Sequence, residues 1–237
     1  MQKLREYLRE KDGIYFIDDK NNLYYEKENG EIVKLSLFRD HFYNIRIYNK
    51  VPVLEIDGLR MQVMKGFKNP REYSEKVIKN LGIKKKSVVL DTCMGLGYTA
   101  LAAAKSGAIV FTIEYSSAVI ELAKYCPHSK EIFKNDNVCI INGDASQEIK
   151  NIDDGYFDFV IHDPPRFTHA PQLYSLQFYK ELKRVMKKRG RLYHYVGSVG
   201  ANRKRRNIWA EITMRLRLAG FIDIKRDRLL QGIFAKA

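Results

Sequence analysis

Short apolar runs alternate with amphipathic segments along most of the chain. Runs rich in Val, Ile and Leu, which are typical of buried strands, fall at 88–91, 109–114, 138–142, 157–162 and 191–196. Helical patterns lie before, between or after them, at 71–81, 100–106, 117–125, 173–188 and 208–219. Two further strands, at 221–226 and 232–236, are expected to close as an antiparallel hairpin. This alternation predicts an α/β protein with a doubly wound, mostly parallel, Rossmann-like sheet.

The first 66 residues follow a different pattern, in which short aromatic and β-branched runs replace the helical period. Strands are predicted at 14–17, 23–25 and 32–37, and Asn29-Gly30 predicts a hairpin turn. A second hairpin is predicted to cross Pro52, with arms at 46–51 and 53–56. The chain is therefore predicted to divide into a small β-rich N-terminal domain, 1–66, and an α/β domain, 67–237. Tyrosines in the small domain make it a candidate for RNA binding, although strand tyrosines more often pack.

The loop after the strand at 88–91 is the first candidate site. Asp91 ends that strand, and Gly95 and Gly97 precede a helix. Glycines let a ligand approach the backbone, and the first helical turn adds free N–H groups and a positive dipole end. The segment 95–100 also matches the dinucleotide fingerprint, with Glu114 ending the next strand. Asp91 argues against a dinucleotide, because its carboxylate would repel a pyrophosphate but attract an α-amino group and a sulfonium.

This loop resembles the first motif of class I S-adenosylmethionine-dependent methyltransferases, an acidic residue followed by a glycine-rich loop. Cys93 is a departure, since many members carry a glycine there. The resemblance implies S-adenosyl-L-methionine as the cofactor, with Asp91, Glu114 and Asp144 at its methionine moiety, ribose and adenine. The predicted cofactor-binding residues are Asp91, Cys93, Gly95, Gly97, Tyr98, Thr99, Glu114, Tyr115, Asp144 and Ala145.

A second candidate site, predicted to be catalytic, follows the fourth strand as Asp163-Pro164-Pro165-Arg166-Phe167. It resembles the fourth motif of amino-methyltransferases, Asp-Pro-Pro and an aromatic, except that Arg166 takes the aromatic position. The exocyclic amine of a base is poorly nucleophilic because its lone pair is delocalised into the ring. Asp163 and the Pro164 carbonyl can accept its two N–H groups on a loop stiffened by proline. Either Arg166 or Phe167 is then expected to stack on the base.

The two motifs, together with 173–175, 178–182 and 194–197, resemble one group over about residues 60–237. This group is the archaeal predicted methyltransferases, similar to those that methylate the N4 amine of cytidine in ribosomal RNA. The resemblance implies a ribosomal RNA cytosine N4-methyltransferase, whereas the residues alone argue only for an amine acceptor. His162 should point to the opposite side of its strand from Asp163, so a packing role is predicted for it.

Positive charge is concentrated in the last quarter of the chain. Residues 180–237 contain 17 Lys and Arg but 4 Asp and Glu, which gives +13 of the net charge of +14. This asymmetry favours a polyanionic partner, most simply RNA, over a general role in solubility. Arg203, Lys204, Arg205 and Arg206 follow the fifth strand of the sheet and are predicted to hold RNA phosphates near the active site.

The composition narrows the remaining classes. The charged start and the lack of an apolar run of about 18 residues predict a cytoplasmic protein without a membrane span. Cys93, Cys126 and Cys139 have no paired spacing, so neither a metal site nor a disulfide framework is expected.

Two alternative functions stay open. One is aminopropyl or methyl transfer to a small amine, which the basic C-terminal quarter opposes. The other is a nucleic-acid-binding module with a vestigial cofactor site, which the intact acidic and glycine positions oppose.

Overall fold

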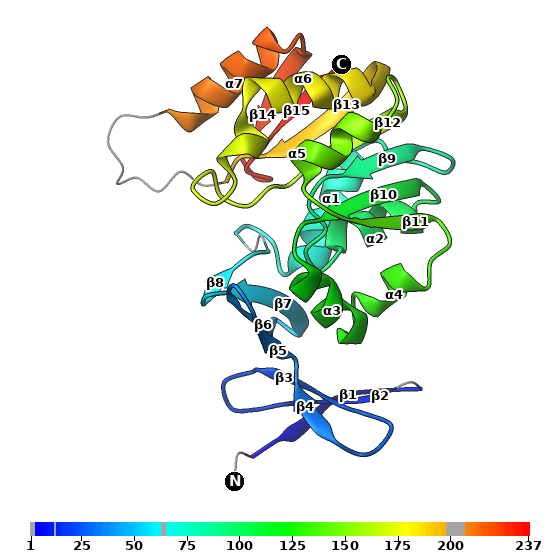
Figure 1. Cartoon of the computed structure of the whole chain (residues 1–237), viewed down its shortest axis with the longest axis vertical. Helices are drawn as coiled ribbons and strands as arrows, with labels where there is room; N and C mark the ends of the chain where they lie inside the picture. Colours follow the sequence, from blue (N-terminus) through cyan, green and yellow to red (C-terminus); the bar gives the residue numbers. More distant parts are fainter. Residues whose placement is uncertain (1–2, 12, 63–64, 198–206) are drawn as a thin grey trace.

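A seven-stranded sheet with helices on both faces forms the larger part of the protein (Figure 1). The computed structural model describes residues 3–11, 13–62, 65–197 and 207–237. Its large sheet has the order β11-β10-β9-β12-β13-β15-β14. These strands are β9 (Val88–Asp91), β10 (Ile109–Glu114), β11 (Val138–Asn142), β12 (Phe157–His162), β13 (Met186–Tyr195), β14 (Ile222–Asp227) and β15 (Gly232–Lys236). β15 runs antiparallel to both of its neighbours, whereas β9 to β13 are parallel, which confirms the predicted Rossmann-like sheet and its terminal hairpin.

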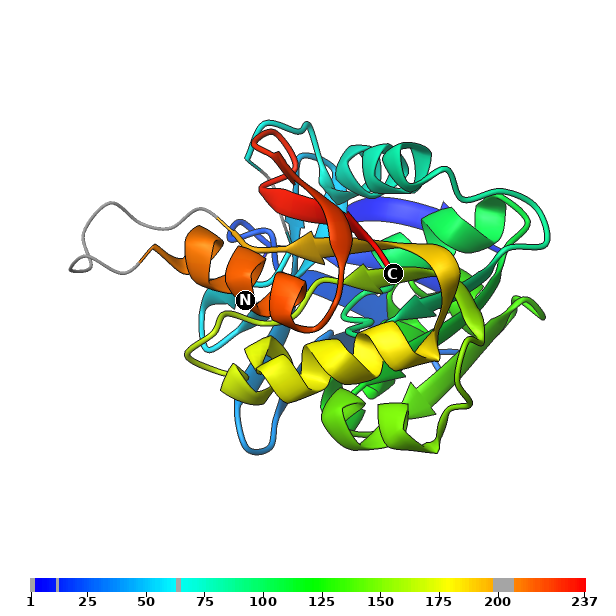
Figure 2. The same ribbon diagram turned by 90° about the horizontal axis from the view of Figure 1, so that it is seen from above.

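Alternate side chains of the central strands enter two separate cores. Leu90 and Val160 face the layer that contains α6 (Leu176–Val185) and α7 (Ile208–Leu218). Val89 and Ile161 face α1 (Pro70–Leu81) and α2 (Tyr98–Lys105). Figure 2 shows α1 and α6 on opposite sides of the sheet. Because the sheet is covered on both faces, successive side chains of these strands are apolar, and the sequence shows continuous hydrophobic runs. No helix among the described residues has the length and apolarity needed to cross a membrane.

The N-terminal residues form two antiparallel sheets of four strands each. The first contains β1 (Arg5–Glu10), β2 (Gly13–Ile17), β3 (Leu23–Glu26) and β4 (Ile32–Lys34). The second contains β5 (Ser36–Phe38), β6 (Phe42–Tyr48), β7 (Val51–Ile56) and β8 (Leu59–Arg60). The Asn29-Gly30 hairpin is confirmed between β3 and β4. The single strand predicted at 32–37 is instead divided between the two sheets at Leu35.

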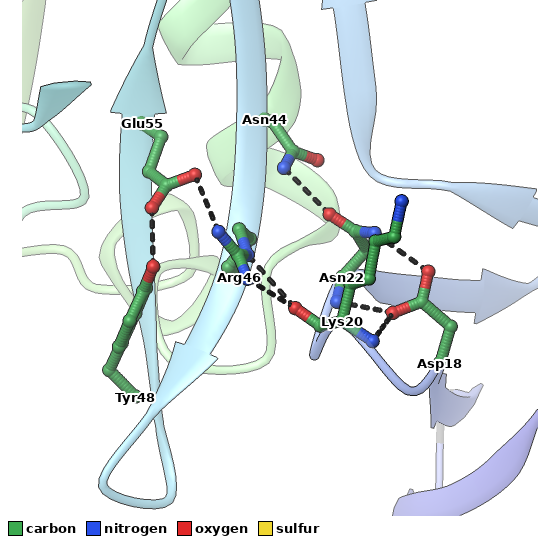
Figure 3. Close-up of polar contacts among 7 residues, drawn as sticks. All are labelled: Asp18, Lys20, Asn22, Asn44, Arg46, Tyr48 and Glu55. Atoms are coloured by element: carbon green, nitrogen blue, oxygen red, sulfur yellow. Dashed lines mark hydrogen bonds and ion pairs between the residues drawn. The ribbon is translucent and has the colours of Figure 1, made fainter. Parts of the chain in front are cut away.

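A polar network ties the two N-terminal sheets together (Figure 3). The Asn44 amide donates to the Asn22 side-chain oxygen at 2.9 Å, and Asn22 in turn donates to Asp18 at 2.7 Å. The Arg46 guanidinium donates to the Lys20 carbonyl at 3.0 Å from Nε. Because Asn44 and Arg46 belong to β6 whereas the other partners precede β3, these contacts fix the angle between the sheets.

Two further sequence predictions of local structure were wrong. The hairpin between β6 and β7 turns at Asn49 and Lys50, which both have positive φ, whereas Pro52 lies inside β7 opposite Ile47. Two positive φ values are what a tight two-residue hairpin requires. The helix predicted to run to residue 188 ends at Val185, and β13 begins at Met186 instead of residue 191. The sequence analysis also did not predict β1, β8, α4 (Lys130–Phe133), α5 (Ala145–Glu148) or the 3₁₀ segment Ile149–Asn151. The helix predicted from residue 173 begins at Leu176, and a 3₁₀ segment, Pro171–Tyr174, precedes it.

The N-terminal sheets share a hydrophobic core with the large sheet's helices. The cluster contains Tyr43 and Leu54 from the N-terminal part, and Leu96 and Leu122 from the glycine loop and α3 (Ser117–Tyr125). The Tyr98 hydroxyl donates to the Pro52 carbonyl across this boundary at 2.7 Å. The N-terminal strands therefore pack directly against the loop that was predicted to bind the cofactor.

Candidate active site

Three carboxylates meet at the carboxyl edge of the large sheet. Glu114, Asp91 and Asp163 end or follow β10, β9 and β12, which are adjacent in this order. Cys93 lies close to all three. Burial raises the pKa of the Cys93 thiol most, and the carboxylates that raise it further are Glu114, Asp91 and Asp163. The structure thus brings the two candidate sites of the sequence analysis together in one place.

Asp91 is fully buried and only half satisfied. Its Oδ2 accepts hydrogen bonds from Thr112 at 2.9 Å and Thr99 at 3.3 Å. Its Oδ1 is buried and has no hydrogen-bond partner among the residues that the structure describes. Burial raises the pKa of Asp91 to about 8, and the charge of Asp163 adds to this effect. An unpaired carboxylate oxygen beside a glycine loop fits the α-amino group of S-adenosylmethionine, which would supply both a donor and the opposite charge.

Glu114 holds the glycine loop in place. Its Oε2 accepts from the Gly95 N–H at 2.8 Å, and its Oε1 accepts from the Ser116 N–H at 2.9 Å. Burial raises the pKa of Glu114, although these backbone donors oppose the rise. Carboxylate oxygens accept more than one hydrogen bond each, so Glu114 keeps acceptor capacity for the ribose hydroxyls that the resemblance assigns to it.

The two glycines of the loop serve different purposes. Both have left-handed backbones, with φ of 54° at Gly95 and 69° at Gly97. A Cβ on Gly97 would lie 1.7 Å from Cδ1 of Ile132, so this glycine is required by packing against α4. A Cβ on Gly95 would lie 3.6 Å from the Gln62 amide nitrogen, with no closer neighbour. Gly95 is thus the glycine that leaves room for a ligand.

The other residues predicted to bind the cofactor lie in different surroundings. The Tyr98 ring stacks on His128 at 3.9 Å between centroids, and its hydroxyl binds the N-terminal part. Tyr115 is 74% exposed at the end of β10. Asp144 caps α5 by accepting from the Ser146 N–H at 2.8 Å, and Ala145 is buried behind it. Asp91, Cys93, Gly95, Thr99 and Glu114 therefore form the compact part of the predicted set.

Asp163 lies near four tyrosines that the sequence analysis did not predict as site residues. The Tyr73 hydroxyl donates to Asp163 at 3.4 Å and lies 2.8 Å from the Tyr193 hydroxyl. The charge of Asp163 also raises the pKa of Tyr174 and Tyr195, after burial as the larger cause. Burial raises the pKa of Asp163 itself to about 7, and the Tyr73 hydrogen bond opposes this rise. The carboxylate is therefore a hydrogen-bond and proton acceptor that gains its own proton near neutral pH.

The loop after Asp163 is fixed by Tyr174. The Tyr174 hydroxyl donates to the Pro165 carbonyl at 2.8 Å, and its ring meets Phe167 edge-on at 5.5 Å. Phe167 also packs against the core. Pro164 is buried, whereas Pro165 and Arg166 are exposed. Of the two side chains predicted to stack on a base, Phe167 is engaged by the protein and Arg166 faces outward.

His162 has the packing role that was predicted. Its Nε2 lies 3.0 Å from the Leu173 carbonyl, which can only accept, so Nε2 carries the proton. Its Nδ1 then accepts from the Thr92 hydroxyl at 2.7 Å. Burial lowers the pKa of His162 to about 3, so the ring is neutral at physiological pH. This histidine connects the glycine loop to the segment that carries Tyr174.

The N-terminal part contributes to the same site, which the sequence analysis did not predict. The Gln62 side-chain oxygen accepts from the Leu54 N–H at 2.7 Å, and this leaves its amide nitrogen over Gly95. The pKa of Asp57, in the turn after β7, is lowered first by the Phe42 N–H and next by the His41 ring at 2.6 Å, with His169 as the smallest cause. His169 belongs to the loop after Asp163, so this loop lies near the second N-terminal sheet.

The predicted RNA contacts Arg203, Lys204, Arg205 and Arg206 lie outside the described residues. Several other basic residues of the C-terminal quarter are used within the protein. Arg184 pairs with Asp154 at 2.6 Å, and Lys187 pairs with Asp158 at 2.8 Å. Positive charges at the end of α6 and the start of β13 are thus partly neutralised.

Comparisons with known proteins identify the type of domain and the family. Residues 89–190 match the family model of a methyltransferase domain. The chain is 44% identical over 217 residues to the uncharacterized protein MJ1233 of Methanocaldococcus jannaschii, covering 92% of this chain and 74% of that protein.

Three solved structures share the fold. A spermidine synthase in complex with the transition-state analogue AdoDATO has a TM-score of 0.70 at 18% identity, covering 87% of this chain and 76% of that one. The spermidine synthase of Thermotoga maritima has a TM-score of 0.67 at 17% identity, covering 88% and 75%. A SAM-dependent methyltransferase from Aquifex aeolicus has a TM-score of 0.53 at 22% identity, covering 69% and 88%.

Proposed function

We propose that this chain, which belongs to the same family as MJ1233 and is an S-adenosylmethionine-dependent methyltransferase, acts on an amine. The proposed acceptor is an exocyclic amine of an RNA base. The specific candidate is N4 of cytidine in ribosomal RNA. The observation that carries the proposal is the position of Asp163. Its carboxylate lies one strand away from Asp91, at the same sheet edge as the glycine loop, and is surrounded by hydroxyl groups.

This arrangement can activate a neutral amine. S-adenosylmethionine, when bound, supplies an electrophilic methyl group. Above pH 7 the ionised Asp163 accepts an N–H of the substrate amine, which directs the nitrogen lone pair away from the carboxylate. As the new C–N bond forms, the bond between the methyl group and the sulfonium would break and leave a neutral thioether. Asp163 or water would then take the excess proton of the cationic nitrogen. Tyr73 holds the carboxylate, and Tyr174 binds the Pro165 carbonyl, so the loop that carries Asp163 and the Pro164 carbonyl is oriented before the substrate binds.

Radiolabelled S-adenosylmethionine tests the proposal directly. Ribosomal RNA from a strain lacking the gene is incubated with the protein, and the nucleosides are identified by mass spectrometry. We expect N4-methylated cytidine with the wild type, no product with Asp163→Ala, and wild-type turnover with the exposed control Asp136→Ala. Calorimetry should give nearly equal cofactor affinity for all three proteins. Turnover by Asp163→Ala would exclude the role given to this carboxylate.

Aminopropyl transfer to a small amine is the second candidate. The spermidine synthases align with 87% and 88% of the chain, whereas the Aquifex methyltransferase aligns with 69%. The larger share includes part of the N-terminal sheets, which also contact the candidate site through Gln62. Incubation with putrescine and decarboxylated S-adenosylmethionine distinguishes the two reactions, since an aminopropyl product has a different mass from a methylated one.

Contacts to RNA phosphates by residues 203–206 are also part of the proposal. Replacing all four basic residues by alanine should weaken RNA binding and flatten its dependence on salt. An unchanged affinity and salt slope would remove these residues from the interface.

A further inference from the structure

A cavity separate from the three carboxylates of the candidate active site lies near Tyr195, beside the β14–β15 hairpin. Its volume is about 320 Å³, which is within the range of small-molecule sites. Its lining consists of Lys65, Gly197, Trp209, Arg226, Arg228 and Gln231. Half of these residues are cations and none is acidic, so the cavity suits an anion.

The cavity is assembled from separate parts of the chain. The Gln231 carbonyl accepts from the Val196 and Gly197 N–H groups at 3.0 and 3.1 Å, which ties the end of β13 to the hairpin turn. The Arg226 guanidinium lies 5.8 Å from the centre of the Trp209 ring of α7, so the indole supports it. Arg226 lies near the end of β14, and Arg228 is the first residue of the turn that follows this strand, so both are next to the hairpin turn that carries Gln231.

The acidic neighbour of these arginines is occupied elsewhere. Asp227 lies between them in sequence, but its Oδ1 accepts from the Leu230 N–H and its Oδ2 accepts from Asn80. Among the described residues, Lys65, Arg226 and Arg228 have no ion pair with any carboxylate. The positive charges of these three side chains repel one another, and an anion bound in the cavity would reduce this repulsion.

One tyrosine separates this cavity from the candidate active site. A Cβ on Gly197, which lines the cavity, would lie 3.5 Å from the Tyr195 hydroxyl. The Tyr195 ring meets the Tyr73 ring edge-on at 6.4 Å between centroids, and the Tyr73 hydroxyl donates to Asp163 at 3.4 Å. A ligand in the cavity would therefore lie next to Tyr195, which borders the tyrosines around Asp163.

We propose that this cavity binds a backbone phosphate of single-stranded RNA next to the nucleotide that is methylated, an inference that rests on the proposed function. Guanidinium groups match phosphate oxygens in pairs, and Lys65 adds a third charge. The same cations disfavour a polyamine substrate, because its ammonium groups would be repelled near the entrance to the site.

Binding of a fluorescent 12-nucleotide single-stranded RNA tests the inference. The variants are Arg226→Ala/Arg228→Ala, the charge-preserving Arg226→Lys/Arg228→Lys, and the control Lys76→Ala/Lys124→Ala, which removes two exposed charges from α1 and α3. The alanine pair should weaken binding by about 10- to 30-fold at physiological salt and lower the salt slope by about 1–2. The lysine pair should restore the slope but only part of the affinity, and the control should differ little from wild type.

Three outcomes would overturn the inference or limit it to another ligand. An alanine pair that binds RNA no more weakly than the control would exclude the cavity. Cytidine monophosphate binding as tightly as the 12-nucleotide RNA would overturn the choice of an RNA backbone in favour of a small phosphorylated ligand. Inorganic phosphate protecting the protein against heat equally in the wild type and the alanine pair would also count against the site.

The binding assay is independent of turnover, because it is performed without cofactor. Wild-type protein that binds RNA through these arginines but transfers no methyl group would refute the proposed function and leave the phosphate site intact. Methyl transfer to RNA with equal binding by the alanine pair and the control would refute only the phosphate site.

Discussion

Replacing Asp91 by asparagine should stabilise the protein in the absence of cofactor. Asp91 is completely buried, its Oδ1 has no partner among the described residues, and burial raises its pKa to about 8. The unfolded chain loses this proton near pH 3.8, so between these two values the folded protein binds more protons than the unfolded one. The free energy of unfolding therefore falls as the pH rises through this window.

The size of the effect follows from the pKa. A rise from 3.8 to about 8 corresponds to about 5–6 kcal/mol once the carboxylate is fully ionised. The asparagine oxygen can still accept from Thr112 and Thr99. The NH₂ group of the asparagine, however, takes the place of the unpaired Oδ1. Its buried N–H donors have no acceptor there, which lowers the free energy of unfolding by about 1–3 kcal/mol. The net gain is about 3 kcal/mol at pH 8.5, or about 6–12 °C in Tm for a chain of this length, and it disappears near pH 5.

Urea unfolding at a series of pH values between 5 and 9 measures this difference. Asp136→Asn is the matched control, since Asp136 is exposed and its loss should change stability little at any pH. Calorimetry should show that Asp91→Asn binds S-adenosylmethionine much more weakly, because the α-amino group loses its counter-charge. The reasoning would be refuted by an Asp91→Asn protein that is less stable than the wild type at pH 8.5, or by a difference that does not grow with pH.

Three further predictions concern neighbouring residues. The kcat/KM of the wild type should fall about tenfold per pH unit below pH 7, as Asp163 gains its proton, and steady-state rates between pH 5.5 and 8.5 check this. Tyr174→Phe should lose the bond to the Pro165 carbonyl and about tenfold in kcat, with Tm nearly unchanged in a thermal melt. Gly97→Ala should cost about 2–4 kcal/mol in urea unfolding, because its methyl group meets Ile132, and Ile132→Ala should restore part of this loss.

Local patterns predicted the repeating part of the fold well. The bounds of β10, α3, β11 and β12 match the sequence expectations to the residue. These strands are β-branched on both faces, and α3 has Ser116 as its cap, accepting from the Val119 N–H at 3.4 Å. Local sequence alone determines such elements, because their hydrophobic period and end signals coincide.

The errors occur where tertiary pairing overrides the local pattern. Met186 continues the spacing of the buried residues of α6, but it pairs with Phe157 of β12 and starts β13. The turn at Asn49 and Lys50 needs positive φ at both residues, and lysine carries no such signal. The tyrosines around Asp163 come from α1, the 3₁₀ segment and β13, so only the folded topology brings Tyr73 within reach of a residue 90 positions away.

Acidic and basic residues occupy different parts of the site. The sheet edge contains the buried Asp91 and the partly buried Glu114 and Asp163, and desolvation makes all three carboxylates costly to ionise without a cation. S-adenosylmethionine carries such charge in its ammonium and sulfonium groups, so binding it lowers this cost. The cavity near Tyr195 carries the opposite sign, through Lys65, Arg226 and Arg228. A neutral base amine attached to an anionic backbone satisfies both regions at once, whereas a cationic polyamine satisfies only the sheet edge and would compete there with the cofactor.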